Sequence, residues 1–248
     1  MRYTRLALIS VLSTLALGTV AMPVAAQSSA SAELINGLNG KLLYVGIPIT
    51  ILVEAILIYT VIKFRNNDDA TPTQENRRLE ITWTVATALI LLFVGVASYG
   101  VLANENITYQ PEAENAAGEA VNGQEQQPEP VVVYAEAYQW GWEMSYPEAG
   151  NFTNGNTMVI PADRPVVIQT SSRDVIHGFH VPKMALKTDS MPGQINTIKT
   201  VPYETGSYQG YCTQFCGVAH SQMYFTVDVV PQDEYQQWLT NQQNSAES

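Results

Sequence analysis

The sequence predicts a membrane-anchored protein in which two transmembrane helices form a hairpin that is followed by an all-β sandwich or barrel. Three observations lead to this fold class. Two apolar runs of membrane-spanning length, Leu42–Ile62 and Ile81–Ala103, lie in the first half of the chain. Short runs rich in β-branched and aromatic residues fill 131–230. A polar, acidic segment, 104–130, separates the two parts.

The first 26 residues are predicted to be a secretory signal peptide. Arg2 and Arg5 precede a long apolar run, and Ala25 and Ala26 supply the small residues typical of a cleavage site. A retained additional transmembrane helix is the alternative. The mature chain is then expected to begin with a short extracytoplasmic segment, 27–41.

The orientation of the hairpin, 42–103, follows from the charges of its flanking segments. Each apolar run is close to the roughly 20 residues that cross a bilayer core. The loop 64–80 carries three arginines, whereas 104–130 carries six glutamates and no basic residue. The positive-inside rule therefore predicts a cytoplasmic loop and an extracytoplasmic second half. Glu54 lies within the first run, where a carboxylate is either functional or protonated against a partner helix.

The chain is acidic, with a formal net charge of −11. This balance argues against nucleic acid as a partner, because phosphate binding needs basic patches. It suits the saline medium of a halophile, for example a haloarchaeon, and an acidic surface that receives a basic partner is the alternative. The segment 104–130 is too polar to fold and is predicted to be a linker.

The second half is long enough to bury a core of its own, and 131–231 is predicted to be one β domain. Turn residues such as Asn154-Gly155 and Pro192-Gly193 separate its short runs. Six strands are predicted, at Val131–Ala137, Thr157–Ile160, Pro165–Thr170, Gln194–Thr200, Gly206–Tyr211 and Met223–Val230. A short helix and a polar tail are expected in 232–248.

A dense group of soft metal ligands lies between the last two predicted strands. Cys212, Cys216 and His220 are each four residues apart, and Met223 follows three later. Thiolate, imidazole and thioether together favour copper over hard cations.

Two alternatives remain from the residues alone. A disulfide between the two cysteines leaves the other two ligands idle, and a closed zinc site gives the methionine no role. A zinc or copper site needs one more imidazole, and His177 or His180, on a connection upstream, can supply it.

Four motifs in order resemble subunit II of the haem–copper cytochrome oxidases. CTQFCGVAHSQM looks like the loop that holds the family's binuclear copper centre, CuA, and DVIHGFHVP with LKTDSMPG resembles the segment of its first histidine ligand. LEITWT resembles the start of its second membrane helix, and YQWGWEMSYP its aromatic stretch. The resemblance covers 42–230 apart from the acidic linker. It implies that the β domain is a Greek-key, cupredoxin-like sandwich or barrel.

The resemblance also implies a set of ligands for two copper ions: His177, Cys212, the backbone carbonyl of Gln214, Cys216, His220 and Met223. The two cysteines resemble the bridging thiolates. His177 and Met223 resemble the ligands of one ion, and His220 with the Gln214 carbonyl those of the other. His180 is then a residue that lies next to the ligands and does not bind copper itself.

Three further residues match functional positions of the family. Trp140 matches the tryptophan at which electrons enter from the donor, and Trp142 supports it; packing is the alternative role for both. Glu80 matches a carboxylate associated with proton uptake near the cytoplasm, with an ordinary helix-start residue as the alternative.

Gln214 departs from the family pattern. Many members have a glutamate there, which helps to bind Mg²⁺ or Mn²⁺ at the subunit interface, and a neutral amide is a weaker ligand for a hard cation. The magnesium site is therefore left open, while copper is unaffected because it uses the backbone oxygen. The motifs combine features of the A-type and B-type oxidases.

The implied function is an electron-accepting subunit of a terminal respiratory oxidase in the cell membrane. A donor outside the membrane, a cytochrome c or a small blue copper protein, delivers electrons that pass to haem in subunit I, where oxygen is reduced to water. A copper-bearing subunit of a nitric oxide reductase-type complex and a copper-binding assembly protein are the alternatives.

Overall fold

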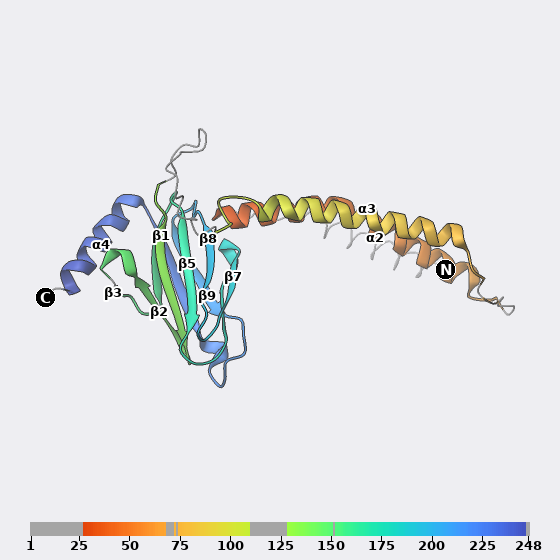
Figure 1. The fold of residues 1–248 in the computed structure, drawn as a ribbon. Helices are drawn as coiled ribbons and strands as arrows, with labels where there is room; N and C mark the ends of the chain where they lie inside the picture. The colour runs from red at the N-terminus through yellow and green to blue at the C-terminus, as the bar shows by residue number, and fades with distance from the viewer. Residues whose placement is uncertain (1–26, 68–71, 73, 110–127, 151, 247–248) are drawn as a thin grey trace, which may run out of the picture.

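The computed structural model describes residues 27–67, 72, 74–109, 128–150 and 152–246. The predicted signal peptide and most of the predicted linker lie outside these residues. The described part consists of a helical hairpin and a β-sandwich that ends in a C-terminal helix (Figure 1).

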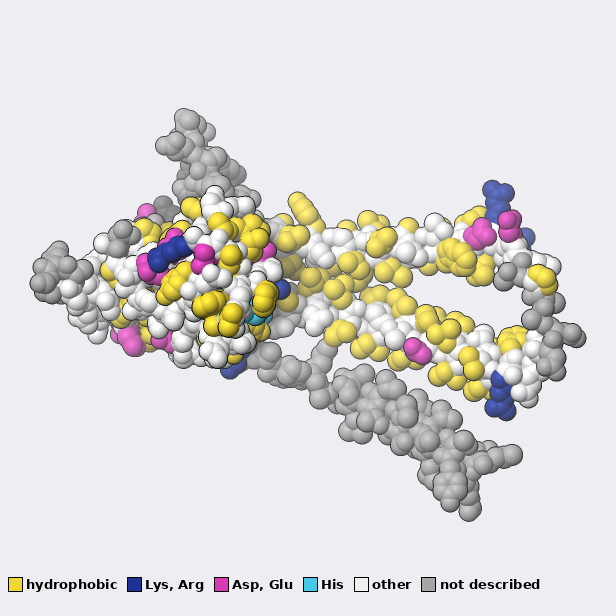
Figure 2. Space-filling model, turned by 90° about the horizontal axis from the view of Figure 1, so that it is seen from below, with side chains coloured by type: hydrophobic (Ala, Val, Ile, Leu, Met, Phe, Trp, Pro, Cys, Tyr) yellow, Lys and Arg dark blue, Asp and Glu magenta, His cyan; other side chains and the backbone are white. Residues whose placement is uncertain are grey.

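The hairpin is formed by helices α2 (Ala30–Phe64) and α3 (Arg77–Leu102), which run side by side away from the sandwich (Figure 1). Both are long and apolar enough to cross a membrane, each with a window of mean hydropathy 2.3. Their apolar side chains face outward along most of their length, as expected where lipid or another subunit covers them (Figure 2). α2 starts well before the apolar run, because Ser29 caps it by accepting a hydrogen bond from the Ala32 amide.

Two five-stranded sheets form the sandwich, with strand orders β3-β2-β1-β5-β8 and β4-β10-β9-β6-β7. β1 lies parallel to β5 and β4 parallel to β10, while the other described pairs are antiparallel. These crossovers between non-consecutive strands are those of a Greek-key sandwich, which confirms the predicted fold class. The strands are β1 (Val131–Tyr138), β2 (Gly141–Tyr146), β3 (Phe152–Thr153), β4 (Thr157–Pro161), β5 (Val166–Ser172), β6 (His177–Val181), β7 (Leu186–Ser190), β8 (Asn196–Thr200), β9 (Gly206–Cys212) and β10 (Tyr224–Val230).

Four strands, β2, β3, β6 and β7, were not among the predicted runs. They are short and contain Gly or polar residues, so their strand structure comes from pairing with neighbours rather than from local propensity. The prediction that His177 lies on a connection is therefore wrong, because His177 is the first residue of β6. The C-terminal helix α4 (Gln232–Ala246) is longer than expected. Three short 3₁₀ turns are η1 (Pro147–Ala149), η2 (Pro182–Met184) and η3 (His220–Gln222).

The core between the sheets is aromatic at the end that carries the cysteines. Trp142 is fully buried, and its ring centroid lies 5.6 Å from that of Phe179 and 5.0 Å from that of Phe225. The rings of Phe179 and Phe225 stack at 4.6 Å. Away from this end, Trp238 of α4 packs on Tyr146, with ring centroids 5.0 Å apart. This packing gives the connecting loops a rigid base.

The start of α2 is fastened to the sandwich by residues 28–31, which are all buried. Ser28 and Ser29 donate their hydroxyls to the carbonyls of η2, Ser29 at 2.7 Å from the Met184 oxygen. The Ala30 amide donates to the Val201 carbonyl just after β8. On the same strand Lys199 donates to the carbonyl of Glu105, just beyond α3. Both helices are therefore attached to one edge of the sandwich.

Candidate metal centre

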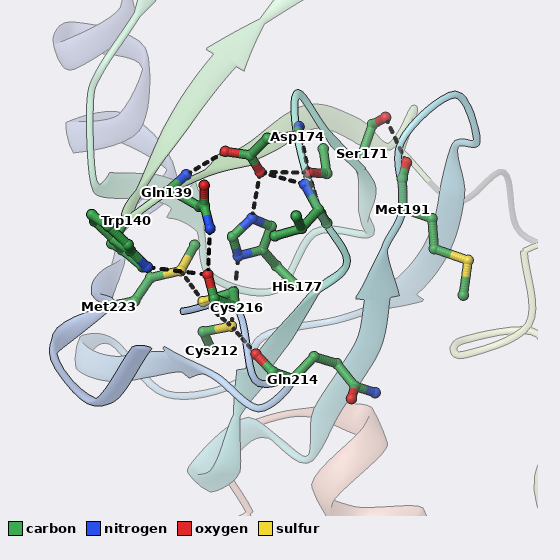
Figure 3. A network of polar contacts seen from close by, with 12 residues as sticks. Gln139, Trp140, Ser171, Asp174, His177, Met191, Cys212, Gln214, Cys216 and Met223 are labelled. Atoms are coloured by element: carbon green, nitrogen blue, oxygen red, sulfur yellow. Dashed lines mark hydrogen bonds and ion pairs between the residues drawn. The ribbon is translucent and has the colours of Figure 1, made fainter. Parts of the chain in front are cut away.

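The predicted ligands lie together at one end of the sandwich, where three connections meet (Figure 3). They are the β1–β2 turn (139–140), the β5–β6 connection (173–176) and the β9–β10 loop (213–223), which is drawn in blue at the bottom of Figure 1. Residues far apart in the sequence meet here because strand pairing aligns the ends of β1, β5, β6 and β9.

The two cysteines form the middle of the group. Cys212 is the last residue of β9 and Cys216 lies in the following loop, and both are buried. Their Sγ atoms are 3.9 Å apart, almost twice the roughly 2.05 Å of a disulfide bond. Both are free thiols, so the structural disulfide is not formed.

His177 is completely buried and held by a carboxylate. Its Nε2 lies 2.8 Å from Oδ1 of Asp174, and its Nδ1 faces the Cys212 sulfur at 3.8 Å. A carboxylate that accepts the Nε2 proton leaves the Nδ1 lone pair free for a metal. Desolvation raises the pKa of Asp174, but hydrogen bonds from His177 and from the amides of Val175 and Gln139 outweigh it, so the pKa is lowered.

The remaining ligand groups surround the same two sulfurs. The Cys216 Sγ lies 3.5 Å from His220 Nδ1 and 3.7 Å from the Met223 Sδ. The Gln214 carbonyl oxygen lies 3.2 Å from the Cys212 Sγ. All six predicted groups thus converge, with Met223 buried and His220 partly exposed.

This donor set fits a soft metal ion. The ligand atoms of His177, Cys212 and Cys216 lie within 4.8 Å of one another, so these three residues could hold a metal. Burial, and then the neighbouring Cys212, raise the pKa of Cys216 to about 11. The metal-free thiol is therefore protonated at neutral pH, and a metal that binds the thiolate must displace that proton.

The β1–β2 turn closes the group from one side. The Cys216 carbonyl accepts hydrogen bonds from Gln139 Nε2 at 2.6 Å and from the Trp140 indole at 3.2 Å. The Gln139 amide donates to Asp174 Oδ2 at 2.7 Å. Gly217 permits this approach, since its φ is +121° and an added Cβ would lie 3.2 Å from the Trp140 ring.

Sequence reasoning assigned no role to Gln139 or Asp174. Both lie within the quoted motifs, directly beside Trp140 and three residues before His177, so position within the motif was the only available signal. Their contacts join residues 35 and 77 positions apart, which no local pattern reveals.

Four residues singled out from the sequence lie outside the group. His180 faces away on β6, where Nδ1 lies 3.0 Å from the Leu186 carbonyl. Trp142 lies beneath the ligand group in the core, with its ring centroid 6.4 Å from that of His177. Glu80 is in the first turn of α3, at the end of the hairpin remote from the sandwich, and Glu54 lies within α2 (Figure 1).

The Gln214 side chain points away from the sulfurs (Figure 3). Its amide donates to Asp189 Oδ1 at 2.9 Å. A glutamate at this position would face the Asp189 carboxylate instead, so the amide and Asp189 form a matched pair.

Together the hairpin, the Greek-key sandwich and the soft-ligand group define the class of membrane-anchored, cupredoxin-like proteins with a candidate soft-metal site. Comparison with known proteins specifies the family. The model of "Cytochrome C oxidase subunit II, transmembrane domain" matches residues 16–101, and that of "Cytochrome C oxidase subunit II, periplasmic domain" matches residues 151–230.

Two curated relatives agree with these models, and one solved structure is also similar. Cytochrome c oxidase subunit 2 of Synechocystis sp. is 30% identical over 251 residues, covering 88% of this chain and 74% of the relative. That of Cereibacter sphaeroides is 29% identical over 258 residues, covering 88% and 77%. The periplasmic domain of subunit II of cytochrome oxidase from Bradyrhizobium japonicum aligns with a TM-score of 0.46 and 28% identity, covering 48% of this chain and 97% of that one.

The chain belongs to the cytochrome c oxidase subunit II family. It is a membrane protein, and its role is that of the subunit through which electrons enter a haem–copper oxidase, an oxidoreductase whose partner subunit reduces oxygen to water. The nitric oxide reductase and assembly-protein alternatives are not favoured.

Proposed function

We propose that the six converging groups bind two copper ions as a CuA-type centre and that this centre accepts electrons from a donor outside the membrane. The observation that carries the proposal is the pair of free, buried thiols 3.9 Å apart, with an imidazole nitrogen beside each sulfur. When bound, two copper ions held by these groups would supply a site that takes up one electron at a time.

The protein supplies a fixed and largely dry set of ligands. Asp174 holds the His177 ring, and the Gly178 amide lies 3.5 Å from the Cys212 sulfur, where it donates a hydrogen bond. Gln139 and Trp140 hold the Cys216 carbonyl. Ligands fixed in this way need little movement when the charge of the site changes.

Trp140 is the proposed point at which electrons enter. Its side chain is 41% exposed, while its indole nitrogen donates to the carbonyl of the ligand Cys216. One residue thus contacts both solvent and the metal loop. Gln214 lies on the other side of the group from Trp140, so donor and subunit I can approach from different directions (Figure 3).

The topology of the full chain forms part of the proposal. The arginines of the loop 64–80 support a cytoplasmic hairpin loop and an extracytoplasmic sandwich. Arg2 and Arg5, with the apolar run that follows them, support removal of residues 1–26 as a signal peptide. Glu80, in the first turn of α3, then lies near the cytoplasmic surface, the position expected for a carboxylate that takes part in proton uptake.

The test is copper titration of the full chain in detergent. Binding of two copper ions per chain is expected, with an electron paramagnetic resonance spectrum in which one unpaired electron is shared by two equivalent copper nuclei. A single copper ion, or preferential binding of one zinc ion, would contradict the proposal.

Met223→Leu is expected to shift the reduction potential of the centre while two copper ions stay bound. The thioether would be a weak donor to a soft metal ion, and leucine fills the same buried volume without a donor atom. Redox titration followed by copper analysis measures both quantities. Complete loss of copper would show that Met223 is more than a weak ligand.

A further inference from the structure

Glu54 is the one charged residue of the two apolar runs that cross the membrane, Leu42–Ile62 and Ile81–Ala103. It lies twelve residues after Leu42 and eight before Ile62. At 1.5 Å per residue, these separations place it about 18 Å and about 12 Å from the ends of its run, close to the middle of the hydrocarbon layer. An acidic side chain accordingly interrupts the hydrophobic surface of the hairpin partway along its length (Figure 2). A carboxyl group at this depth is costly unless a polar partner covers it.

No such partner for Glu54 is found among the residues that the structure describes. Its side chain is exposed on α2, and no hydrogen bond or ion pair joins it to another described residue. Threonine hydroxyls along the hairpin donate within their own helices. Thr50 and Thr60 donate to carbonyls of α2 at 3.0 and 2.9 Å, and Thr87 donates to a carbonyl of α3 at 2.7 Å. The hairpin therefore leaves the carboxyl uncompensated.

The side chains one turn to either side of Glu54 form a surface that suits a second helix. Ile51, Leu57 and Ile58 lie three or four residues from Glu54, on the same side of α2. Their exposed fractions are 63%, 52% and 51%. Rows with this spacing are those that interlock when two helices pack. A transmembrane helix that crossed α2 here would bury the carboxyl in the middle of the contact.

Subunit I is the membrane protein placed to supply that helix. Both helices of the hairpin are attached to the β8 edge of the sandwich, so the hairpin and the metal group keep a fixed relation. Electrons that leave the metal group pass to haem in subunit I, so subunit I must lie beside this chain. Lipid tails cannot take its place at Glu54, because they carry no hydrogen-bonding group.

We propose that Glu54 forms a hydrogen bond, inside the membrane, with an uncharged polar side chain on a transmembrane helix of subunit I. This inference rests on the proposed function, because it takes as the neighbour the subunit that receives the electrons. An uncharged partner is favoured, since removing two ions from water has a large desolvation cost. Apolar side chains alone would let the two helices slide past each other, whereas a single polar contact fixes their alignment.

The test is the strength of association between this chain and subunit I in the complete oxidase. Fluorescence energy transfer between a label on each subunit gives their apparent dissociation constant in detergent micelles. In Glu54→Leu this constant is expected to rise about three- to twentyfold, the range that corresponds to one interhelical hydrogen bond. Leucine suits a membrane helix better than glutamate does, so the variant is expected to insert normally. Glu54→Gln is expected to stay within about twofold of the unmodified oxidase, because an amide of the same size both donates and accepts hydrogen bonds.

Thr50→Val is the matched control. Thr50 lies one turn from Glu54, but its hydroxyl already donates to the Gly46 carbonyl at 3.0 Å. Valine removes that hydroxyl with almost no change of shape, so the dissociation constant is expected to stay unchanged. A rise as large as that of Glu54→Leu would show that any change on this side of α2 loosens the complex, and would overturn the hydrogen-bond assignment.

The remaining outcomes separate the inference from the function on which it rests. An unchanged dissociation constant in Glu54→Leu would refute the contact with subunit I. Association as weak in Glu54→Gln as in Glu54→Leu would refute an uncharged partner, since only an ion pair requires the carboxylate. The two-copper spectrum, recorded on the same samples, is expected to be the same in all variants. Its absence from the unmodified oxidase would refute the proposed function instead.

Discussion

Cys216→Ser is expected to abolish the two-copper centre. The Cys216 sulfur lies within 3.9 Å of three predicted ligand atoms: the Cys212 sulfur, the His220 Nδ1 and the Met223 sulfur. A hydroxyl is a poor ligand for a soft metal, so the affinity for copper should fall by more than ~100-fold, beyond the effect of losing an outer partner. Copper analysis and the paramagnetic spectrum measure the loss.

Cys212→Ser should have an equally large effect, because both thiolates are proposed to bridge. Ser221→Ala, an exposed position in the same loop, is the control and should leave copper binding unchanged. If Cys212→Ser or Cys216→Ser retained two copper ions with the shared spectrum, the bridging assignment would be wrong.

Trp142→Ala is expected to cause the largest loss of stability in the sandwich. The indole is fully buried among Phe179, Phe225 and the edge of His177, and removal of a buried Trp typically costs about 3–5 kcal/mol of unfolding free energy. Denaturant unfolding of the detergent-solubilised chain, followed by β-sheet circular dichroism, measures this change separately from the helices.

Trp140→Ala provides the contrast for this measurement. Its ring is partly exposed, so its removal should cost about 1 kcal/mol or less, while electron uptake from the donor falls sharply. Equal destabilisation by both substitutions would mean that Trp140 serves packing rather than electron transfer.

The membrane hairpin and most of the ligand set could be predicted because their signals are local. The length of their apolar runs identifies α2 and α3. The segment from Cys212 to Met223 holds five of the six predicted ligand groups close together in the sequence. His177 was assigned from the resemblance, but its place on β6 was missed, since that strand depends on pairing with β7 and β9.

The supporting residues could not be predicted for a different reason. Gln139 and Asp174 act through hydrogen bonds to distant parts of the chain, and their residue types are common on any surface. Likewise, nothing local indicates that residues 28–31 become buried against η2 and β8, because three serines and one alanine are compatible with exposed chain.

The attachment of both membrane helices to the β8 edge of the sandwich has a further consequence. A domain joined to its membrane helices by one flexible linker would sample many positions above the bilayer. Its contact with a membrane partner would then depend on the effective concentration that the linker allows. Here Ser29 and Ala30 fix one helix and Lys199 fixes the chain after the other. The sandwich therefore acts as a rigid extension of the hairpin, so the orientation of the metal group is set when the helices insert, before any partner or donor arrives.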